Sequence, residues 1–101
     1  MVVVRDIFQL KFGQAKEAVT LWKQVIAINQ RRGYGTAATR MLTDLVGPAY
    51  YTLILETTFD SVAQFEKGIK EVLADPEWRA IYAKIIPLTE SGRREILSVV
   101  A

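Results

Sequence analysis

The chain has 101 residues, of which 50% are hydrophobic and 24% are charged. This length and composition predict one globular domain over residues 1–101. The formal net charge of +2 comes from 13 basic and 11 acidic residues that are interspersed along the chain. This pattern argues against nucleic-acid binding, which typically uses a clustered basic stripe.

The sequence contains no cysteine, which excludes disulfides, thiolate nucleophiles and cysteine-based zinc sites. The apolar start at residues 1–4 is interrupted by Arg5 and Asp6, well short of a signal-peptide core. No run approaches the ~18 to 20 apolar residues of a membrane span. We therefore expect a cytoplasmic protein with neither a membrane nor a nucleic-acid partner.

Alternation predicts a first strand over residues 2–12, with one face on the core. The core-facing set is Val2, Val4, Asp6, Phe8, Leu10 and Phe12. After Gly13, apolar residues at three-and-four spacing predict an amphipathic helix from Gln14 to about Arg31. Gly33 and Gly35 provide its stop signal, because glycine tolerates the left-handed backbone that ends helices.

Two further strands are predicted at residues 36–46 and 49–59, separated by the turn dipeptide Gly47-Pro48. The second of these strands is rich in aromatic, β-branched and threonine residues. Because the turn between them is short, we expect an antiparallel hairpin.

A second helical stretch follows from Ser61 or Val62 to about Leu73, with Ser61 and Gln64 placed as a reciprocal capping box. Asp75-Pro76 then provides an N-cap and a first-turn proline for a helix over residues 77–86. The sequence leaves open whether this stretch is one bent helix or two. A loop at residues 88–92 and a closing strand at residues 93–100 complete the chain.

This order of elements predicts an α+β fold of ferredoxin-like βαββαβ type, with a four-stranded antiparallel sheet whose first and third strands are central and whose helices lie on one face. The other face would carry Val3, Ile7 and Ile54 among polar residues. Because an uncovered apolar sheet face favours association, we expect a homodimer through this face.

Several segments resemble dimeric α+β barrel proteins, first the NIPSNAP-like branch and second the antibiotic-biosynthesis-monooxygenase-like branch. The resemblance covers nearly the whole chain. Its segments are Leu10-Lys11-Phe12-Gly13 before a long helix, Phe59-Asp60-Ser61 entering a helix with Phe65, Ala74-Asp75-Pro76-Glu77-Trp78, and Gly92-Arg93-Arg94-Glu95-Ile96-Leu97. It implies a homodimer with back-to-back sheets and a small-molecule pocket between sheet and helices. It implies no single activity, because related barrels include oxygenases, isomerases, haem-degrading enzymes and proteins of unknown role.

The residues argue against haem, metal and cofactor chemistry. The chain has no histidine, the commonest near-neutral general base and metal ligand. The haem-degrading relatives use an asparagine, a tryptophan and a histidine, and pattern alignment places Asp6, Phe59 and Ile69 at those positions. The carboxylates lack metal-ligand spacing, so no metal site and no cofactor are expected.

Asp6 is the candidate catalytic residue, because it stands among apolar residues on the helix-facing side of the first strand. A carboxylate there is a pocket acid or base, the partner of an arginine such as Arg94 or Arg40, or a group at the strand edge that meets solvent. The remaining pocket candidates are aromatic residues that could equally form the core: Phe8, Trp22, Tyr51, Phe59, Phe65, Trp78 and Tyr82.

Three functions fit these observations. The first is a homodimeric barrel of unassigned biochemical role that binds a small apolar or aromatic ligand between sheet and helices. The second is a cofactor-independent monooxygenase or isomerase acting on a phenolic or quinol-like substrate. The third is a purely structural interaction module.

Overall fold

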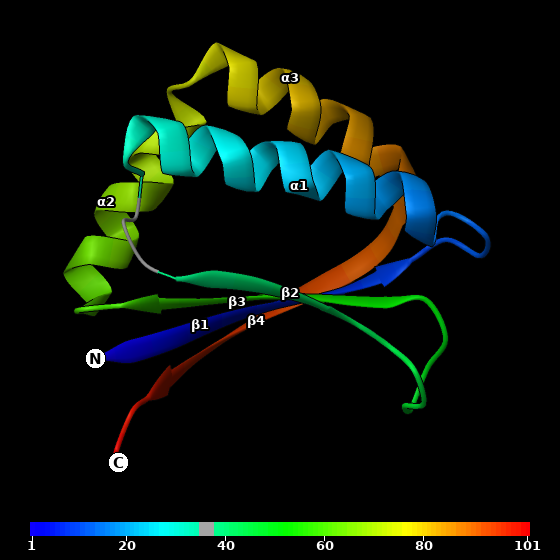
Figure 1. The fold of residues 1–101 in the computed structure, drawn as a ribbon, viewed down its shortest axis with the longest axis horizontal. Coiled ribbons are helices and arrows are strands. Elements are labelled where there is room, and N and C mark those ends of the chain that lie inside the picture. The colour runs from blue at the N-terminus through cyan, green and yellow to red at the C-terminus, as the bar shows by residue number, and fades with distance from the viewer. Residues whose placement is uncertain (35–37) are drawn as a thin grey trace.

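The computed structural model describes residues 1–34 and 38–101 as a four-stranded sheet with helices packed on one face (Figure 1). β1 (Val2–Leu10), β2 (Thr39–Thr43), β3 (Thr52–Phe59) and β4 (Thr89–Ser98) lie in the order β2-β3-β1-β4. Each neighbouring pair is antiparallel. The ferredoxin-like order of elements and the central position of the first and third strands, both predicted from the sequence, are confirmed.

Three α-helices cover the same side of the sheet, and α1 lies beside α3 in Figure 1. They are α1 (Ala15–Arg32), α2 (Val62–Leu73) and α3 (Pro76–Ile85), and a short 3-10 helix, η1 (Ile86–Leu88), leads from α3 into β4. The second helical stretch is therefore two helices. Asp75 separates them, since its carboxylate accepts hydrogen bonds from the backbone of Glu77 and Trp78 and so begins a new helix.

The helix ends follow the predicted signals with one variation. Gly33 adopts a left-handed backbone with φ of 72° and ends α1. Ser61 Oγ accepts from the Gln64 backbone N–H at 3.2 Å, and the Gln64 side chain accepts from the backbone N–H of Asp60. Gly35 and the start of the strand predicted at residue 36 lie outside the described residues.

The hairpin between β2 and β3 is longer than the short turn that was predicted. Residues 44–51 connect the two strands, so β2 ends at Thr43 and β3 begins only at Thr52. The Asp44 carboxylate accepts from Thr52 N at 2.9 Å and closes the hairpin ahead of Gly47. Tyr51 has φ of 57°, which interrupts the extended backbone predicted from residue 49 onward.

The boundaries of β1 and β4 also need correction. β1 ends at Leu10 rather than residue 12, because Gln14 N bonds to Lys11 O in a turn. The predicted loop at residues 88–92 is wrong from Thr89 onward, because Thr89 and Gly92 pair with Leu10 and Phe8 in the sheet. This segment is polar and lies on an edge strand, where apolar alternation is not required.

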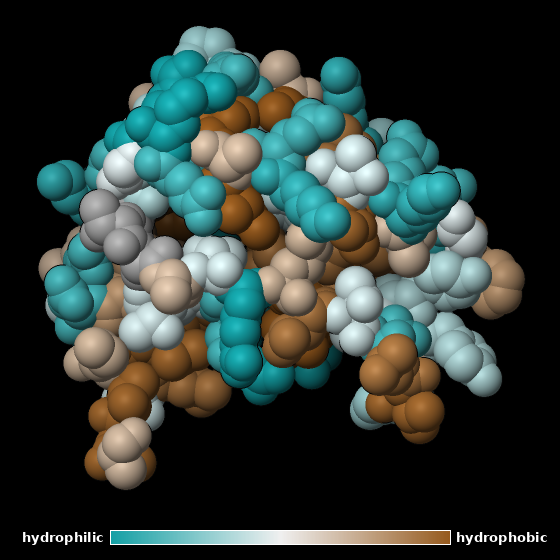
Figure 2. All heavy atoms as spheres, viewed as in Figure 1, coloured by the Kyte–Doolittle hydropathy of each residue, from teal (hydrophilic) through white to brown (hydrophobic). Residues whose placement is uncertain are grey.

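The core lies between the helices and the helix-facing side of β1 and β3. Its largest fully buried side chains are Leu10, Leu53 and Ile85, which belong to β1, β3 and α3. The opposite face carries no helix in Figure 1. Figure 2 shows apolar side chains projecting below the sheet at both ends. Leu45 and Val46 of the β2–β3 connection and Val100 near the C-terminus are each more than nine-tenths exposed.

Candidate functional site

A cavity of about 1140 Å³ lies between the sheet and the helices. β1 and β3 supply its floor through Val4, Asp6 and Leu55, and α1, α2 and α3 supply its walls. Figure 2 shows a recess between the helices and the sheet at the left of the view. This volume lies just above the range of about 300–1,000 Å³ that is typical of small-molecule pockets.

Four aromatic rings form one side of this cavity, which we call the aromatic wall: Phe8, Trp22, Trp78 and Tyr82. The Phe8 and Trp22 rings stack with centroids 5.2 Å apart, and the Trp78 and Tyr82 rings stack at 4.9 Å. The Tyr82 ring meets the edge of Trp22 at 6.1 Å and so joins the two pairs. Residues from β1, α1 and α3 thus build a continuous aromatic surface.

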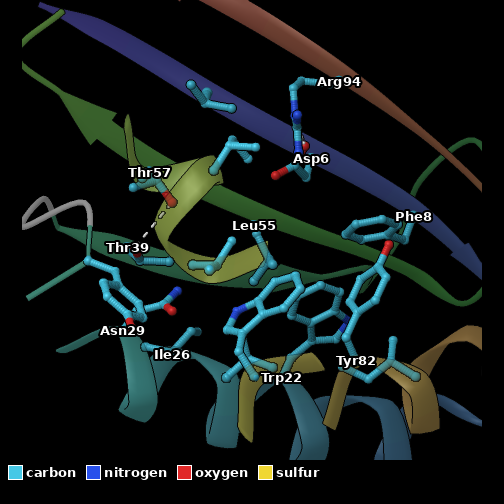
Figure 3. Close-up of a pocket in the computed structure, with 18 of the residues that line it drawn as sticks. Asp6, Phe8, Trp22, Ile26, Asn29, Thr39, Leu55, Thr57, Tyr82 and Arg94 are labelled. Atoms are coloured by element: carbon cyan, nitrogen blue, oxygen red, sulfur yellow. Dashed lines mark hydrogen bonds and ion pairs between the residues drawn. The ribbon is translucent and has the colours of Figure 1, made fainter. Parts of the chain in front are cut away.

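The sheet side of the cavity carries an ion pair. Arg94 Nε donates to Asp6 Oδ1 at 2.6 Å, between neighbouring positions of β4 and β1. The Arg94 guanidinium also lies 5.0 Å from the centroid of the Phe65 ring of α2. Figure 3 shows Asp6 and Arg94 together on the sheet, across the cavity from Trp22 and Tyr82. Asp6 therefore has the arginine partner named among the sequence alternatives.

Three cavity-lining side chains hold buried polar atoms with no hydrogen-bond partner among the described residues. These atoms are Trp22 Nε1, Trp78 Nε1 and Asn29 Oδ1. In Figure 3 the Asn29 amide points from α1 into the cavity beside Thr39. By contrast, the hydroxyls of Thr39 and Thr57 are 3.1 Å apart and satisfy one another. Unsatisfied buried polar groups are uncommon, so these three atoms need an explanation.

A polar contact beside the cavity joins the end of α1 to the start of α3. The Tyr34 hydroxyl donates to Asp75 Oδ2 at 3.1 Å, and Arg32 Nη1 lies 3.3 Å from the same oxygen. Burial opposes ionisation of Asp75, but hydrogen bonds from Trp78 N, Tyr34 and Glu77 N, together with the Arg32 charge, hold its pKa below the usual value. This carboxylate fixes the start of α3, the helix that carries Trp78 and Tyr82.

The cavity brings together most of the sequence candidates. Asp6, Phe8, Phe59, Trp78 and Tyr82 all line it. Tyr51 does not join them. Its ring packs against Phe12, with centroids 4.7 Å apart, at a separate shallow pocket beyond the end of β1. The left-handed backbone at Tyr51 takes its side chain out of the alternation of β3.

One contributor to the site, Asn29, was not among the candidates. Trp22 was among the aromatic residues expected either to line a pocket or to form the core, and it lines the cavity. Asn29 gave a usable signal, since a polar side chain at a core-facing helical position needs either a partner or a cavity. Within residues 1–34 and 38–101, no group of three acidic, cysteine or histidine side chains is placed to hold a metal ion. The same residues include no helix with the length and apolar character needed to cross a bilayer.

Comparison with known proteins identifies the family. The chain matches NIPSNAP over residues 5–101. It belongs to the NIPSNAP family. An uncharacterized NIPSNAP domain protein from Burkholderia xenovorans superposes with a TM-score of 0.84 at 20% identity, covering 100% of this chain and 96% of that one. A NIPSNAP family protein from Agrobacterium tumefaciens gives 0.83 at 20% identity, covering 96% and 90%. No curated protein sequence matches the chain.

Antibiotic-biosynthesis-monooxygenase-like proteins share the fold of this NIPSNAP chain. SnoaB, a cofactor-independent oxygenase from Streptomyces nogalater, superposes with a TM-score of 0.74 at 12% identity, covering 99% of this chain and 93% of that one. At such low identity the likeness concerns the fold alone. The second branch named from the sequence is therefore a structural neighbour of the NIPSNAP chain.

Proposed function

We propose that this NIPSNAP chain, acting as one domain, binds a small apolar or aromatic ligand in the cavity between sheet and helices. The aromatic wall carries the proposal. Stacked rings ordinarily pack against further side chains, whereas Phe8, Trp22, Trp78 and Tyr82 all border a space of about 1140 Å³. Flat rings that border a cavity offer a ligand both apolar area and stacking geometry.

Thermal shift with phenols, quinols and fatty-acid-like compounds tests this proposal. A ligand that binds the native state raises apparent stability by mass action. Thr57→Phe would place a ring inside the cavity from β3, and Thr20→Phe would place the same ring on the exposed side of α1. We expect Thr57→Phe to abolish the ligand-induced shift and Thr20→Phe to retain it. An equal ligand-induced thermal shift in both variants would show that the ligand binds at another part of the surface.

The same site could support chemistry on a phenolic or quinol-like substrate, with Asp6 as the acid or base. The observation that favours this second candidate is the position of the Asp6 carboxylate in the cavity wall. Asp6→Asn keeps the shape of the side chain and removes its charge. Loss of quinol or phenol oxidation by dissolved O₂ in Asp6→Asn, with ligand binding retained, is expected if Asp6 is catalytic. Unchanged turnover would exclude that role.

We further propose that the open face of the sheet pairs with a second copy of the chain. A row of alternating charge crosses this face on all four strands, formed by Arg40, Glu56, Arg5 and Glu95 in that order. A twofold axis parallel to the strands would place each arginine of this row opposite a glutamate of the other copy. Apolar residues, including Ile7 and Ile54, flank the row.

Oligomer mass measured against concentration tests the pairing. Leu97 of β4 is 46% exposed and lies on the open face beside Glu95, whereas Val62 of α2 is 44% exposed on the helical layer. Leu97→Glu should shift the protein toward monomer, and Val62→Glu should leave its mass unchanged. A wild-type protein that stays monomeric at every concentration would refute the proposed dimer.

A further inference from the structure

The two tryptophans of the chain both line the cavity, and both have an indole N–H without a hydrogen-bond acceptor. Trp22 is 4% exposed, and Trp78 is half-buried. The indole Nε1 of each is buried without a hydrogen-bond partner among the described residues. An indole nitrogen is a donor only, so a partner must be an acceptor. Leaving a buried donor unpaired is costly, which makes an acceptor in the cavity favourable.

The two indole rings belong to one stretch of the cavity wall. The Tyr82 ring contacts the two indoles, with centroid distances of 6.1 Å to Trp22 and 4.9 Å to Trp78. A flat compound lying against the aromatic wall would therefore lie beside both indoles at once. Both nitrogens are buried in the free protein, so the indole rings must turn slightly before a ligand acceptor can reach the N–H.

The charge of the cavity lining disfavours an ionic ligand. The charged residues that line it are two acidic and two basic, Asp6, Glu90, Arg93 and Arg94, so their formal charges cancel. The Arg94 Nε–H that faces the Asp6 carboxylate is already committed at 2.6 Å. An anion entering this space would lose its hydration without meeting a net positive charge.

We propose that the ligand is a neutral, planar ring compound whose carbonyl oxygen accepts a hydrogen bond from the indole N–H of Trp22 or Trp78. This inference rests on the proposed ligand-binding function and names the chemical class. The ring system would stack on the aromatic wall, and the carbonyl would supply the acceptor that the indole nitrogen lacks. Asn29 Oδ1 remains available for a ligand hydroxyl or amide N–H, although the proposal does not require one.

Fluorenone and fluorene provide a matched test, because they differ only in a carbonyl in place of a methylene group. Without a donor in the cavity, fluorene should bind more tightly, since the carbonyl of fluorenone must leave water. With a hydrogen bond from an indole N–H to its carbonyl, fluorenone should instead bind about fivefold more tightly than fluorene. Equilibrium dialysis of the wild-type protein measures the ratio of the two dissociation constants.

Trp22→Phe and Trp78→Phe keep an aromatic ring and remove the N–H. Lost packing affects fluorene and fluorenone alike, so the ratio of their affinities isolates the hydrogen bond. We expect the preference for fluorenone to fall about fivefold in at least one variant. The two substitutions provide independent tests, so the proposal stays testable if either prevents folding.

A fluorenone carboxylate should bind at least about tenfold more weakly than the corresponding neutral carboxamide.

The possible failures separate the two proposals. If fluorene and fluorenone both bind the wild type but neither substitution changes their ratio, the carbonyl proposal is overturned and the ligand cavity stands. Tighter binding of the carboxylate than of the carboxamide would also overturn it, by showing that the site selects an anion. If no compound binds the wild type at all, both the proposed function and this inference fail.

Discussion

A methyl group at position 92 would collide with the aromatic wall. A Cβ built on Gly92 would lie 2.8 Å from Phe8 Cδ1 and 3.1 Å from Phe8 Cε1, and the Phe8 ring is already stacked on Trp22 at 5.2 Å. The ring must therefore turn from its rotamer, at about 0.5–1.5 kcal/mol. It must also give up its aromatic pairing, at a further ~0.5–1.5 kcal/mol. Gly92→Ala should thus destabilise the protein by about 1–3 kcal/mol.

Urea unfolding followed by circular dichroism measures this loss. Gly47→Ala is the matched control, because its Cβ would meet nothing within 4 Å, and no loss of stability is expected there. In a Phe8→Ala background the collision disappears, so Gly92→Ala should then cost less than about 0.5 kcal/mol. A Gly92→Ala protein as stable as the Gly47→Ala protein would refute the close contact, as would an equal cost with and without Phe8.

Further expectations concern the core and the α1–α3 contact. Leu53→Ala should lower the free energy of unfolding in urea by about 2–5 kcal/mol because Leu53 is fully buried. Leu45→Ala, at a side chain 98% exposed, should change it by less than about 0.5 kcal/mol. Comparable losses in the two variants would contradict the assigned core. The folded-state pKa of Asp75 lies below its ordinary value of 3.8, so ionised Asp75 stabilises the fold above that pH and the contribution is lost as the pH falls through the lowered pKa. The stability difference between the wild type and Asp75→Asn should therefore shrink from about pH 5 to about pH 2, and a difference independent of pH would show that the carboxylate charge plays no part.

The sequence predicted the architecture because periodicity and turn chemistry act locally. The apolar stripe of α1, the left-handed stop at Gly33 and the Asp75-Pro76 start of α3 are each specified by a few adjacent residues. Edge strand β4 was located less well, since Thr89 joins the sheet by pairing with Leu10 rather than by its own pattern. The long β2–β3 connection depends on a hydrogen bond from Thr52 to Asp44 that residue type alone does not specify.

The sequence predicted which residues contribute to the candidate site but not how they are arranged around the cavity. Alternation placed Asp6 and Phe8 on the helix-facing side of β1, and the pairing of Asp6 with Arg94 follows from the register of β1 and β4. Nothing local could show that Trp22 borders a cavity, because whether a buried indole meets another side chain or empty space is decided by α3. The different position of Tyr51 comes from one backbone angle with φ of 57°.

The chain contains two tryptophans, and both line the proposed ligand cavity. A proton–nitrogen correlation spectrum of the wild-type protein should therefore show two indole N–H signals, each reporting on the aromatic wall. On titration with fluorenone, we expect at least one indole signal to shift in a saturable manner, together with backbone amides of residues that line the cavity. Saturable binding that leaves both indole signals unmoved, or no binding at all, would contradict a ligand site between the sheet and the helices.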